Sequence, residues 1–312
     1  MRPLLVIALG GNAILKKGEK GLVEEQWNNI RTAARAIVSV FKRGYNIVVT
    51  HGNGPQVGNL AEWFESLKNR IPPLTLDIAG AMTQGWIGYM LQIEIGNILE
   101  EEGFERKVIS IINTVLVDPR DPAFDDPTKF IGPYYSREEA LKISLEKKWL
   151  FKEDPRGGWR RVVPSPKPVA NIEIEAIRTL LEKGFIVIAS GGGGVPVYRD
   201  KNVLKGVEAV IDKDLSSSVL AIGLRASKLV ILTDVDGVYL NFGRPDAVLI
   251  KDINLEEAMT LIRRGFLGEG SMKPKVEACV KYVAETGFTC HIGHLEKAVE
   301  VVEGKSGTTI HS

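Results

Sequence analysis

The sequence predicts an α/β fold: an open, mostly parallel sheet with helices on both faces, in three layers, and a small inserted α+β subdomain. Short apolar runs that lack polar alternation are typical of strands buried on both faces, and here they alternate with segments of helical spacing. Three of these runs, residues 4–9, 45–50 and 185–190, end directly in glycine-rich turns. The pattern stops in residues 118–167, which we interpret as the inserted subdomain.

Composition limits the classes of protein to consider. The chain has 312 residues, of which 44% are hydrophobic and 25% charged, and its net charge is +1 at pH 7. Opposite charges are interspersed, so we expect no general attraction to nucleic acid or to acidic membranes. The apolar N-terminal run is too short for a signal peptide, and no apolar run is long enough to span a bilayer. We therefore expect a cytoplasmic protein with small-molecule substrates.

The two cysteines, Cys279 and Cys290, fall in a helical and a strand pattern. Two thiols in a chain of this length indicate a reducing compartment, so we expect free thiols, with a disulfide as the alternative. The sequence contains no Cys-x-x-Cys motif and no histidine cluster completed by other ligands, so we expect no protein-bound metal.

Helical spacing and glycine stops predict the helices between the strands. Asp77 is expected to cap a long helix ending near residue 102, and Gly85, Gly88 and Gly96 within it indicate a closely packed neighbour, such as a second copy of the chain. Other helices are expected at residues 24–43, 55–68, 172–183, 255–264, 271–285 and 295–303, and after residue 214. Further strands are expected at residues 107–117, 228–235, 288–292 and 308–310, with a hairpin at 195–208.

The inserted subdomain begins with a stretch rich in proline and aspartate, residues 118–133. Ser136 and Glu139 form a capping box that opens a short helix to about residue 148. Residues 149–164 predict a hairpin with its turn at 155–158. We expect an N-terminal lobe of residues 1–184, which carries this subdomain, and a C-terminal lobe of residues 185–312.

Each glycine-rich turn is a candidate anion cradle, because glycine lets a ligand approach the backbone closely. The alternative is that each is an ordinary tight turn. The turns match neither the dinucleotide-binding fingerprint nor the Walker A motif, so the cradle is of another kind. The candidate substrate-binding residues are Gly10, Gly11, Asn12, Gly52, Asn53, Gly191 and Gly192.

Three lysines stand out by context: Lys129 in the proline-rich stretch, Lys213 between two aspartates before a helix, and Lys275 after a glycine-containing turn. Lysines at such junctions are well placed to hold phosphate, although each alone could be a solvated surface residue. Asp214 could orient the lysines or cap the helix. Asp234, at a strand end, could contact a ribose, a base or hydrated Mg²⁺, or could form an Asx-turn.

These motifs together resemble the carbamate kinases of the amino acid kinase superfamily. The matching segments span nearly the whole chain in order and include ALGGNA (8–13), THGNGPQVG (50–58), DPAFDDPTKFIGP (121–133), ASGGGGVPV (189–197), GVEAVIDKDL (206–215), LTDVDGVY (232–239) and GSMKPKV (270–276). Lys273 departs from the family pattern, which has a small or apolar residue there.

The resemblance implies reversible phosphoryl transfer from ATP to carbamate, giving ADP and carbamoyl phosphate, with Mg²⁺ held mainly by the phosphates. It implies a carbamate-binding N-terminal lobe, a nucleotide-binding C-terminal lobe and a homodimer. The catalytic residues implied are Lys129, Lys213, Asp214 and Lys275. The nucleotide-binding residues implied are Lys213, Asp234, Tyr239, Phe242, Met272 and Lys275.

Carbamate is already an anion, so its oxygen needs no general base. His51 is the one possible base that the sequence places beside a glycine cradle, and we assign it to loop packing. The absence of a base favours an acid-anion acceptor over an alcohol acceptor. Two alternatives remain: a kinase of the same fold for another small acid or phosphonate, and a non-catalytic nucleotide sensor. The direction of the reaction in the cell is not determined by the sequence.

Overall fold

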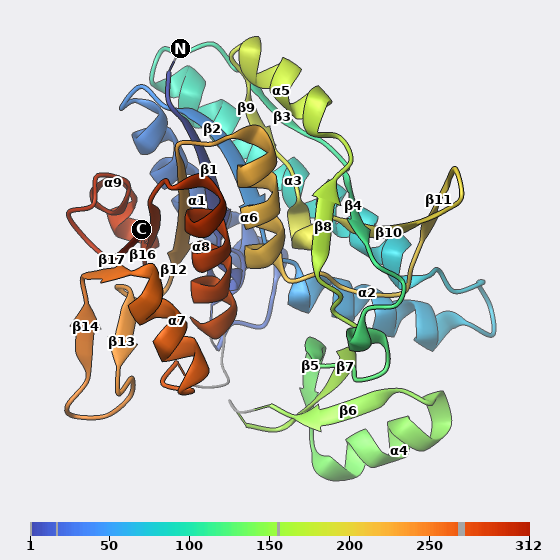
Figure 1. Ribbon diagram of the computed structural model, residues 1–312. Helices are drawn as coiled ribbons and strands as arrows, with labels where there is room; N and C mark the ends of the chain where they lie inside the picture. The colour runs from blue at the N-terminus through green and yellow to red at the C-terminus, as the bar shows by residue number, and fades with distance from the viewer. Residues whose placement is uncertain (1, 17, 155–156, 268–271) are drawn as a thin grey trace.

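One eight-stranded sheet forms the middle layer of the computed structural model, which describes residues 2–16, 18–154, 157–267 and 272–312 (Figure 1). The strand order is β15-β17-β16-β12-β1-β2-β9-β3, and the strand pairs are parallel except β16 with β17. The bounds are β1 Leu4–Leu9, β2 Asn46–His51, β3 Val108–Ser110, β9 Ile186–Ile188, β12 Lys228–Thr233, β15 Asp252–Asn254, β16 Cys290–His294 and β17 Thr308–His311.

The sheet buries both of its faces. In β1, Leu5, Ile7 and Leu9 face one apolar core, and Val6 and Ala8 face the other, as the two-residue period of a strand requires. The first core is covered by α1 (Val23–Phe41), α3 (Leu76–Glu101) and α9 (Ala298–Val302). The second is covered by α5 (Ile174–Glu182), α6 (Lys213–Leu224), α7 (Leu255–Arg263) and α8 (Met272–Thr286). The predicted three-layer α/β fold is confirmed.

The prediction of a single strand at residues 107–117 is wrong, because this segment forms two strands. β3 joins the main sheet, and β4 (Thr114–Val117) joins a second sheet of order β11-β10-β4-β8. The break is held by Asn113, whose backbone N–H donates to Gln84 Oε1 and whose Oδ1 accepts from the Ser190 N–H. The other strands are β8 (Pro168–Asn171) and the predicted hairpin of β10 (Val195–Asp200) and β11 (Val203–Gly206).

The inserted subdomain stands apart from the main sheet at the lower end of the view in Figure 1. Its strands pair in the order β5-β7-β6, with bounds β5 Lys129–Tyr135, β6 Leu150–Glu153 and β7 Trp159–Val163. The predicted capping box opens α4 (Arg137–Lys147): Ser136 Oγ accepts from the Glu139 N–H and Glu139 Oε2 from the Ser136 N–H. The predicted hairpin is β6–β7, and residues 155–156 of its turn lie outside the described residues.

The long helix α3 begins two residues earlier than expected. Thr75 is its N-cap residue, whereas Asp77 lies in its first turn, so the prediction that Asp77 caps the helix is wrong. The Leu76 N–H donates instead to Glu208 Oε1, 3.3 Å away, a partner that is remote in sequence. Among the described residues, no helix is long and apolar enough to cross a bilayer.

The predicted close packing of α3 involves two of its glycines and residues of the same chain. A Cβ built on Gly88 would lie 2.0 Å from Ser110 Oγ, and one built on Gly96 would lie 2.6 Å from Arg106 Cζ. A Cβ on Gly85 would meet nothing within 4 Å. The absence of a side chain at Gly88 and Gly96 therefore lets α3 lie against the segment that leads into β3.

The main sheet also crosses the boundary expected at residues 184/185. β9, the first strand beyond that boundary, pairs with β2 and β3 of the expected N-terminal lobe. The two lobes therefore share one continuous sheet, and their separate roles stay a prediction.

The expectation of two free thiols is wrong. Cys279 of α8 and Cys290 of β16 form a disulfide, with their Cα atoms 5.3 Å apart, and both are fully buried. The strand carries Cys290 beneath the helix that carries Cys279, so the packing of α8 on the sheet brings the two sulfurs together. Their spacing in the sequence contains no sign of this.

Removing this disulfide should lower the free energy of unfolding by about 3 kcal/mol, because the bond closes a short loop in the unfolded chain. Urea titration of the Cys279→Ala/Cys290→Ala double variant against the wild type measures the difference. Thiol titration of the wild type in denaturant without reductant is the control, and two reactive thiols there would contradict the disulfide.

Candidate active site

The three glycine-rich turns meet at one edge of the main sheet. They follow β1, β2 and β9, which are adjacent and parallel, so their carboxyl ends share an edge. A Cβ built on Gly52 would lie 3.8 Å from Gly11 Cα and 3.4 Å from Lys213 Cδ. Ligands of open α/β sheets bind beyond this edge. The predicted convergence of the turns is confirmed, and their binding of a ligand stays a prediction.

The sequence led us to expect that the Gly10 N–H binds an anion, but the structure gives this N–H a backbone partner. This N–H donates to the Leu232 carbonyl, 2.8 Å away, and so links the end of β1 to β12. A Cβ on Gly10 would lie 3.1 Å from the same carbonyl oxygen, so this position is restricted in size. Gly11 begins a short 3₁₀ turn, and the side chain of Asn12 lies outside the described part of the chain.

The third turn is closed by side chains from the second turn. Ser190 and Gly192 have φ values of +51° and +63°, in the left-handed region that favours glycine. A Cβ on Gly191 would lie 2.4 Å from His51 Nε2, and one on Gly192 would lie 2.1 Å from Asn53 Nδ2. Only glycine fits at these two positions. Asn53 is buried and donates to Thr83 Oγ1 at 2.8 Å, so the structure gives it a packing role.

We call the edge of the sheet at which the three glycine-rich turns meet the glycine edge. Five charged side chains lie beside it, although they come from three distant segments. Lys129 Nζ, at the start of β5, lies 2.5 Å from Asp212 Oδ2. Lys213 Nζ donates to Asp214 Oδ1, and Lys275 Nζ of α8 lies 3.1 Å from Asp214 Oδ2. The side chains of Lys213, Asp214 and Lys275 are 11%, 3% and 6% exposed. The structure thus brings together all four predicted catalytic residues.

Asp212 is the residue that our sequence reasoning missed. It is the N-cap of α6, where its Oδ1 accepts from the backbone N–H groups of Asp214 at 2.9 Å and Leu215 at 3.3 Å. The cap is therefore Asp212, and the alternative role of Asp214 as the cap is wrong. An aspartate directly before the first helical residue is a capping signal. Its second oxygen, which binds Lys129, gives no such signal in the sequence.

Burial and pairing oppose each other in the pKa values of this cluster. Burial raises the pKa of Asp214, but Lys213 and Lys275 outweigh it, and the net pKa is lowered. Burial likewise raises the pKa of Asp212, and Lys129, with smaller effects of Lys213 and Lys275, more than reverses this. Both carboxylates are therefore ionised at neutral pH. Burial lowers the pKa of Lys275, but Asp214 and Asp212 outweigh it, so this lysine stays protonated.

Lys213 differs from Lys275, because burial is the dominant influence on it and its net pKa is lowered. Asp214 opposes this shift, and the positive charge of Lys275 adds to it. The cluster thus holds three lysines beside two aspartates, Asp212 and Asp214. The N-terminus of α6 adds its own positive end at the same place. The arrangement is suited to an anion with several charged oxygens, such as a phosphate.

Of the expected nucleotide-binding residues, Asp234, Tyr239 and Phe242 lie around the end of β12 and the hairpin of β13 (Val238–Leu240) and β14 (Val248–Ile250). Thr233 Oγ1 donates to Asp234 Oδ1 at 3.0 Å, and the negative charge of Asp234 helps to keep Lys275 protonated. The rings of Tyr239 and Phe242 lie 5.7 Å apart, and Phe242 is exposed. Met272 packs instead against the apolar core beneath α8.

In the part of the chain that the structure describes, no three histidine, cysteine, aspartate or glutamate residues group together as metal ligands. The two carboxylates of the cluster are engaged by lysines. These two lysine-paired carboxylates therefore do not form a metal-ligand group.

Comparisons with known proteins identify the family. The model of the amino acid kinase family matches residues 3–294. A carbamate kinase from Pyrococcus horikoshii is 48% identical over 98% of this chain and 98% of its own length. The chain belongs to the carbamate kinases of the amino acid kinase family. The resemblance seen in the motifs is confirmed, and the chain is a kinase of this family.

Solved structures agree with this membership. A carbamate kinase from Giardia lamblia bound to citric acid has a TM-score of 0.95 with this chain at 39% identity, and the match covers 99% of this chain and 98% of that one. The same Giardia lamblia enzyme bound to AMP-PNP has a TM-score of 0.91 at 40% identity, covering 99% and 98%. The fold is thus shared over the whole length of both chains.

The buried His51 predicts a pH dependence of stability. Burial lowers its pKa to about 4; the hydrogen bond with the Gly52 carbonyl opposes this shift, and Lys213 adds to it. The unfolded chain protonates this histidine near its ordinary pKa of about 6.5, so the unfolded state binds more protons between these two values. We expect the free energy of unfolding to fall as the pH drops from about 6.5 toward 4.

Urea titrations across this pH range measure the effect. The His51→Gln variant should show a flatter dependence; His291, whose pKa burial also lowers to about 4, and the paired carboxylates of Asp212 and Asp214 contribute to what remains. An unchanged slope in the variant would contradict the assignment of His51 as a neutral packing residue.

Proposed function

We propose that this kinase catalyses reversible phosphoryl transfer between ATP and carbamate, giving ADP and carbamoyl phosphate. The observation that carries the proposal is the cluster of Lys129, Lys213 and Lys275 beside the glycine edge of the sheet. Phosphoryl transfer spreads negative charge over the oxygens of the moving group, and its catalysis depends mainly on positioning and electrostatic stabilisation. Lysines held in fixed positions by Asp212 and Asp214 supply both.

Among the described side chains at this edge of the sheet, His51 is the candidate for a general base, and its position supports an anionic acceptor. His51 is fully buried, lies 3.0 Å through Nδ1 from the Gly52 carbonyl, and directs Nε2 toward Gly191. It therefore has no access to a substrate oxygen. A carbamate oxygen attacks as an anion and needs no proton removed, whereas an alcohol acceptor would need a base.

In this proposal the two lobes have different roles. The N-terminal lobe, residues 1–184, holds carbamate near Gly11 and Gly52, and the C-terminal lobe, residues 185–312, holds the nucleotide near Asp234, Tyr239, Phe242 and Met272. Lys213 and Lys275 flank the phosphates, and Lys129 reaches the transferred group from the inserted subdomain. Mg²⁺ arrives with the nucleotide and neutralises phosphate charge. AMP-PNP, an ATP analogue, occupies the related Giardia lamblia enzyme.

The proposal also includes a homodimer. The exposed apolar side chains of α3, Ile78, Met82 and Tyr89, are 42%, 42% and 57% exposed and would be covered in such an assembly. Sedimentation equilibrium of the purified protein tests this part separately from the activity.

ATP formation from ADP, Mg²⁺ and carbamoyl phosphate by the purified protein tests the reaction. Rapid ATP synthesis supports the proposal. No ATP from folded protein that still binds ADP would refute carbamate as the acceptor, and a panel of small acids and phosphonates would then identify another. ADP binding without turnover on any acceptor would indicate a nucleotide sensor.

Lys213→Ala should lower kcat of this reaction by about 100-fold or more, because it removes a preorganised positive charge from the transferred phosphoryl group. Circular dichroism should show an intact fold, since Lys275 still pairs with Asp214. The control is Lys205→Ala, which removes an exposed lysine paired only with Asp200 in the described contacts of β11. Near-normal turnover in Lys213→Ala would refute the mechanism.

A further inference from the structure

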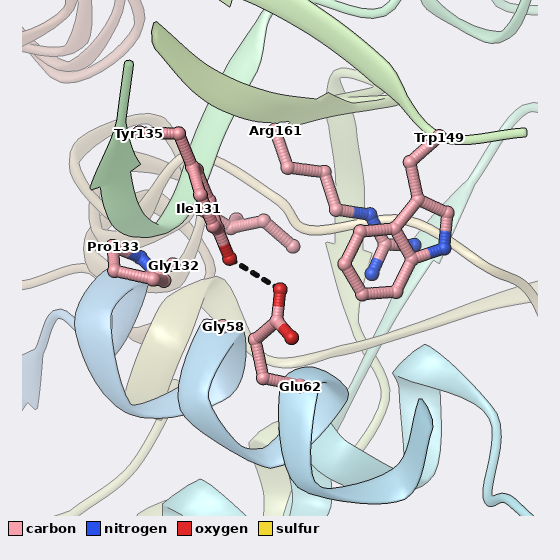
Figure 2. A pocket seen from close by; sticks show the side chains of 8 residues that line it. All are labelled: Gly58, Glu62, Ile131, Gly132, Pro133, Tyr135, Trp149 and Arg161. Atoms are coloured by element: carbon pink, nitrogen blue, oxygen red, sulfur yellow. Dashed lines mark hydrogen bonds between the residues drawn. The ribbon is translucent and has the colours of Figure 1, made fainter. Parts of the chain in front are cut away.

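Glu62 of α2 (Gly54–Leu67) connects the inserted subdomain to the core of the enzyme. The Tyr135 hydroxyl, at the end of β5, donates to Glu62 Oε1, as Figure 2 shows. Lys147 Nζ, at the end of α4, lies 3.5 Å from Glu62 Oε2. A single carboxylate on a core helix thus binds two elements of the subdomain.

The same helix meets the middle of β5 backbone to backbone, and Val57 and Leu60 of α2 share an apolar cluster with Ile131 of β5. A Cβ built on Gly58 would lie 2.0 Å from Gly132 Cα, and Gly132 has a φ of +72°. Arg160 of β7 fixes this point from the other side, because its Nε and Nη2 donate to the Gly132 carbonyl at 3.1 and 2.9 Å. Arg160 is itself buried and paired with Asp154. We call the contact between Gly58 and Gly132 the glycine pivot.

β5 is therefore held at three places. Its first residue, Lys129, pairs with Asp212 in the charged cluster; its middle lies at the glycine pivot; and its last residue, Tyr135, binds Glu62. Lys129 and Tyr135 lie on opposite sides of the pivot along the chain, and the register of β5 with β7 shifts between Ile131 and Tyr135. Both ends of β5 pair with the same strand β7, Lys129 with Val163 and Tyr135 with Trp159, so the position of the Tyr135 end is coupled to that of Lys129.

The surroundings of Glu62 keep this contact intact. Burial, followed by the hydrogen bond to Glu62, raises the pKa of Tyr135, so its hydroxyl stays neutral and remains a donor. The Arg161 guanidinium lies 3.8 Å from the centre of the Trp149 ring, and both residues line the same small space beside Glu62 (Figure 2). The side chain of Glu62 is 23% exposed, so it is partly shielded from water.

We propose that Glu62 is a positioning residue for catalysis: by binding Tyr135 it fixes the far end of β5 about the glycine pivot and so sets Lys129 against the transferred phosphoryl group. The inference rests on the proposed function of Lys129. It assigns to α2 a role beyond packing. This helix starts directly after Asn53, in the glycine-rich turn that follows β2, and carries Glu62 about two turns later.

Steady-state kinetics of Glu62→Ala and Tyr135→Phe test the proposal. Each should lower kcat by about ten-fold or more, the scale of one hydrogen bond to a charged group, while KM for ADP changes less than about two-fold. Glu62→Gln should retain most of the turnover, because its amide oxygen still accepts from Tyr135. The matched control is Glu65→Ala on the same helix, whose carboxylate pairs with Lys68 and should leave kcat unchanged.

The Lys129→Ala background shows whether Glu62 acts through that lysine. Adding Glu62→Ala or Tyr135→Phe to Lys129→Ala should cause no further loss of kcat, because the group being positioned is gone. An undiminished ten-fold loss in this background would overturn the proposal, and so would equal effects of Glu62→Ala and Glu65→Ala.

Hydrogen exchange distinguishes a failure of this proposal from a failure of the proposed function. Glu62→Ala should speed the exchange of backbone amides in β5 whatever the substrate is, whereas Glu65→Ala should not. If the wild type makes no ATP but β5 exchange rises only in Glu62→Ala, the reaction assignment fails and the anchoring of β5 stands. Unchanged exchange in Glu62→Ala would overturn the anchoring itself.

Discussion

The site depends on the carboxylate of Asp214, which lies between the ammonium groups of Lys213 and Lys275. All three side chains are almost fully buried, and an unpaired buried charge costs several kcal/mol. Asp214 therefore makes it possible to hold two lysines out of water at the end of α6. Because Lys213 begins α6 and Lys275 lies on the neighbouring α8, this carboxylate also fixes the two helices relative to each other. The positive charge that remains is suited to a phosphate.

The order of the strands places the glycine-rich turns beside the lysine cluster. β1, β2 and β9 are neighbours, so three turns that are far apart in sequence form one glycine edge. Side chains would block this edge: the space above Gly191 and Gly192 is already filled by His51 and Asn53. The N–H of Gly10 joins β1 to β12. Some of these glycines therefore serve the packing of the sheet, whereas others leave its edge open.

The inserted subdomain adds the third lysine from outside the sheet. Lys129 reaches Asp212 because β5 lies along α2 with backbone against backbone at the glycine pivot. Asp212 has two functions on its two oxygens: one caps α6 and the other binds Lys129. Lysines from α8 and from the inserted subdomain thus both pair with aspartates at the start of α6.

Local sequence determined much of this protein. Neighbouring residues predict the strands buried on both faces, the glycine turns and the capping box at Ser136, because strand period, helix capping and turn geometry are short-range properties. Local context also selected Lys129, Lys213, Asp214 and Lys275 as candidate site residues.

Only the tertiary structure decided which distant groups meet. Asp212 and Lys129 are 83 residues apart, and Glu62 and Tyr135 are 73 apart, so no local period connects them. The same holds for the disulfide of Cys279 and Cys290, for the division of the strand at Asn113, and for the Glu208 carboxylate at the start of α3. These contacts form only when helices and strands pack, and the energy that selects them comes from burial and pairing rather than from backbone propensity.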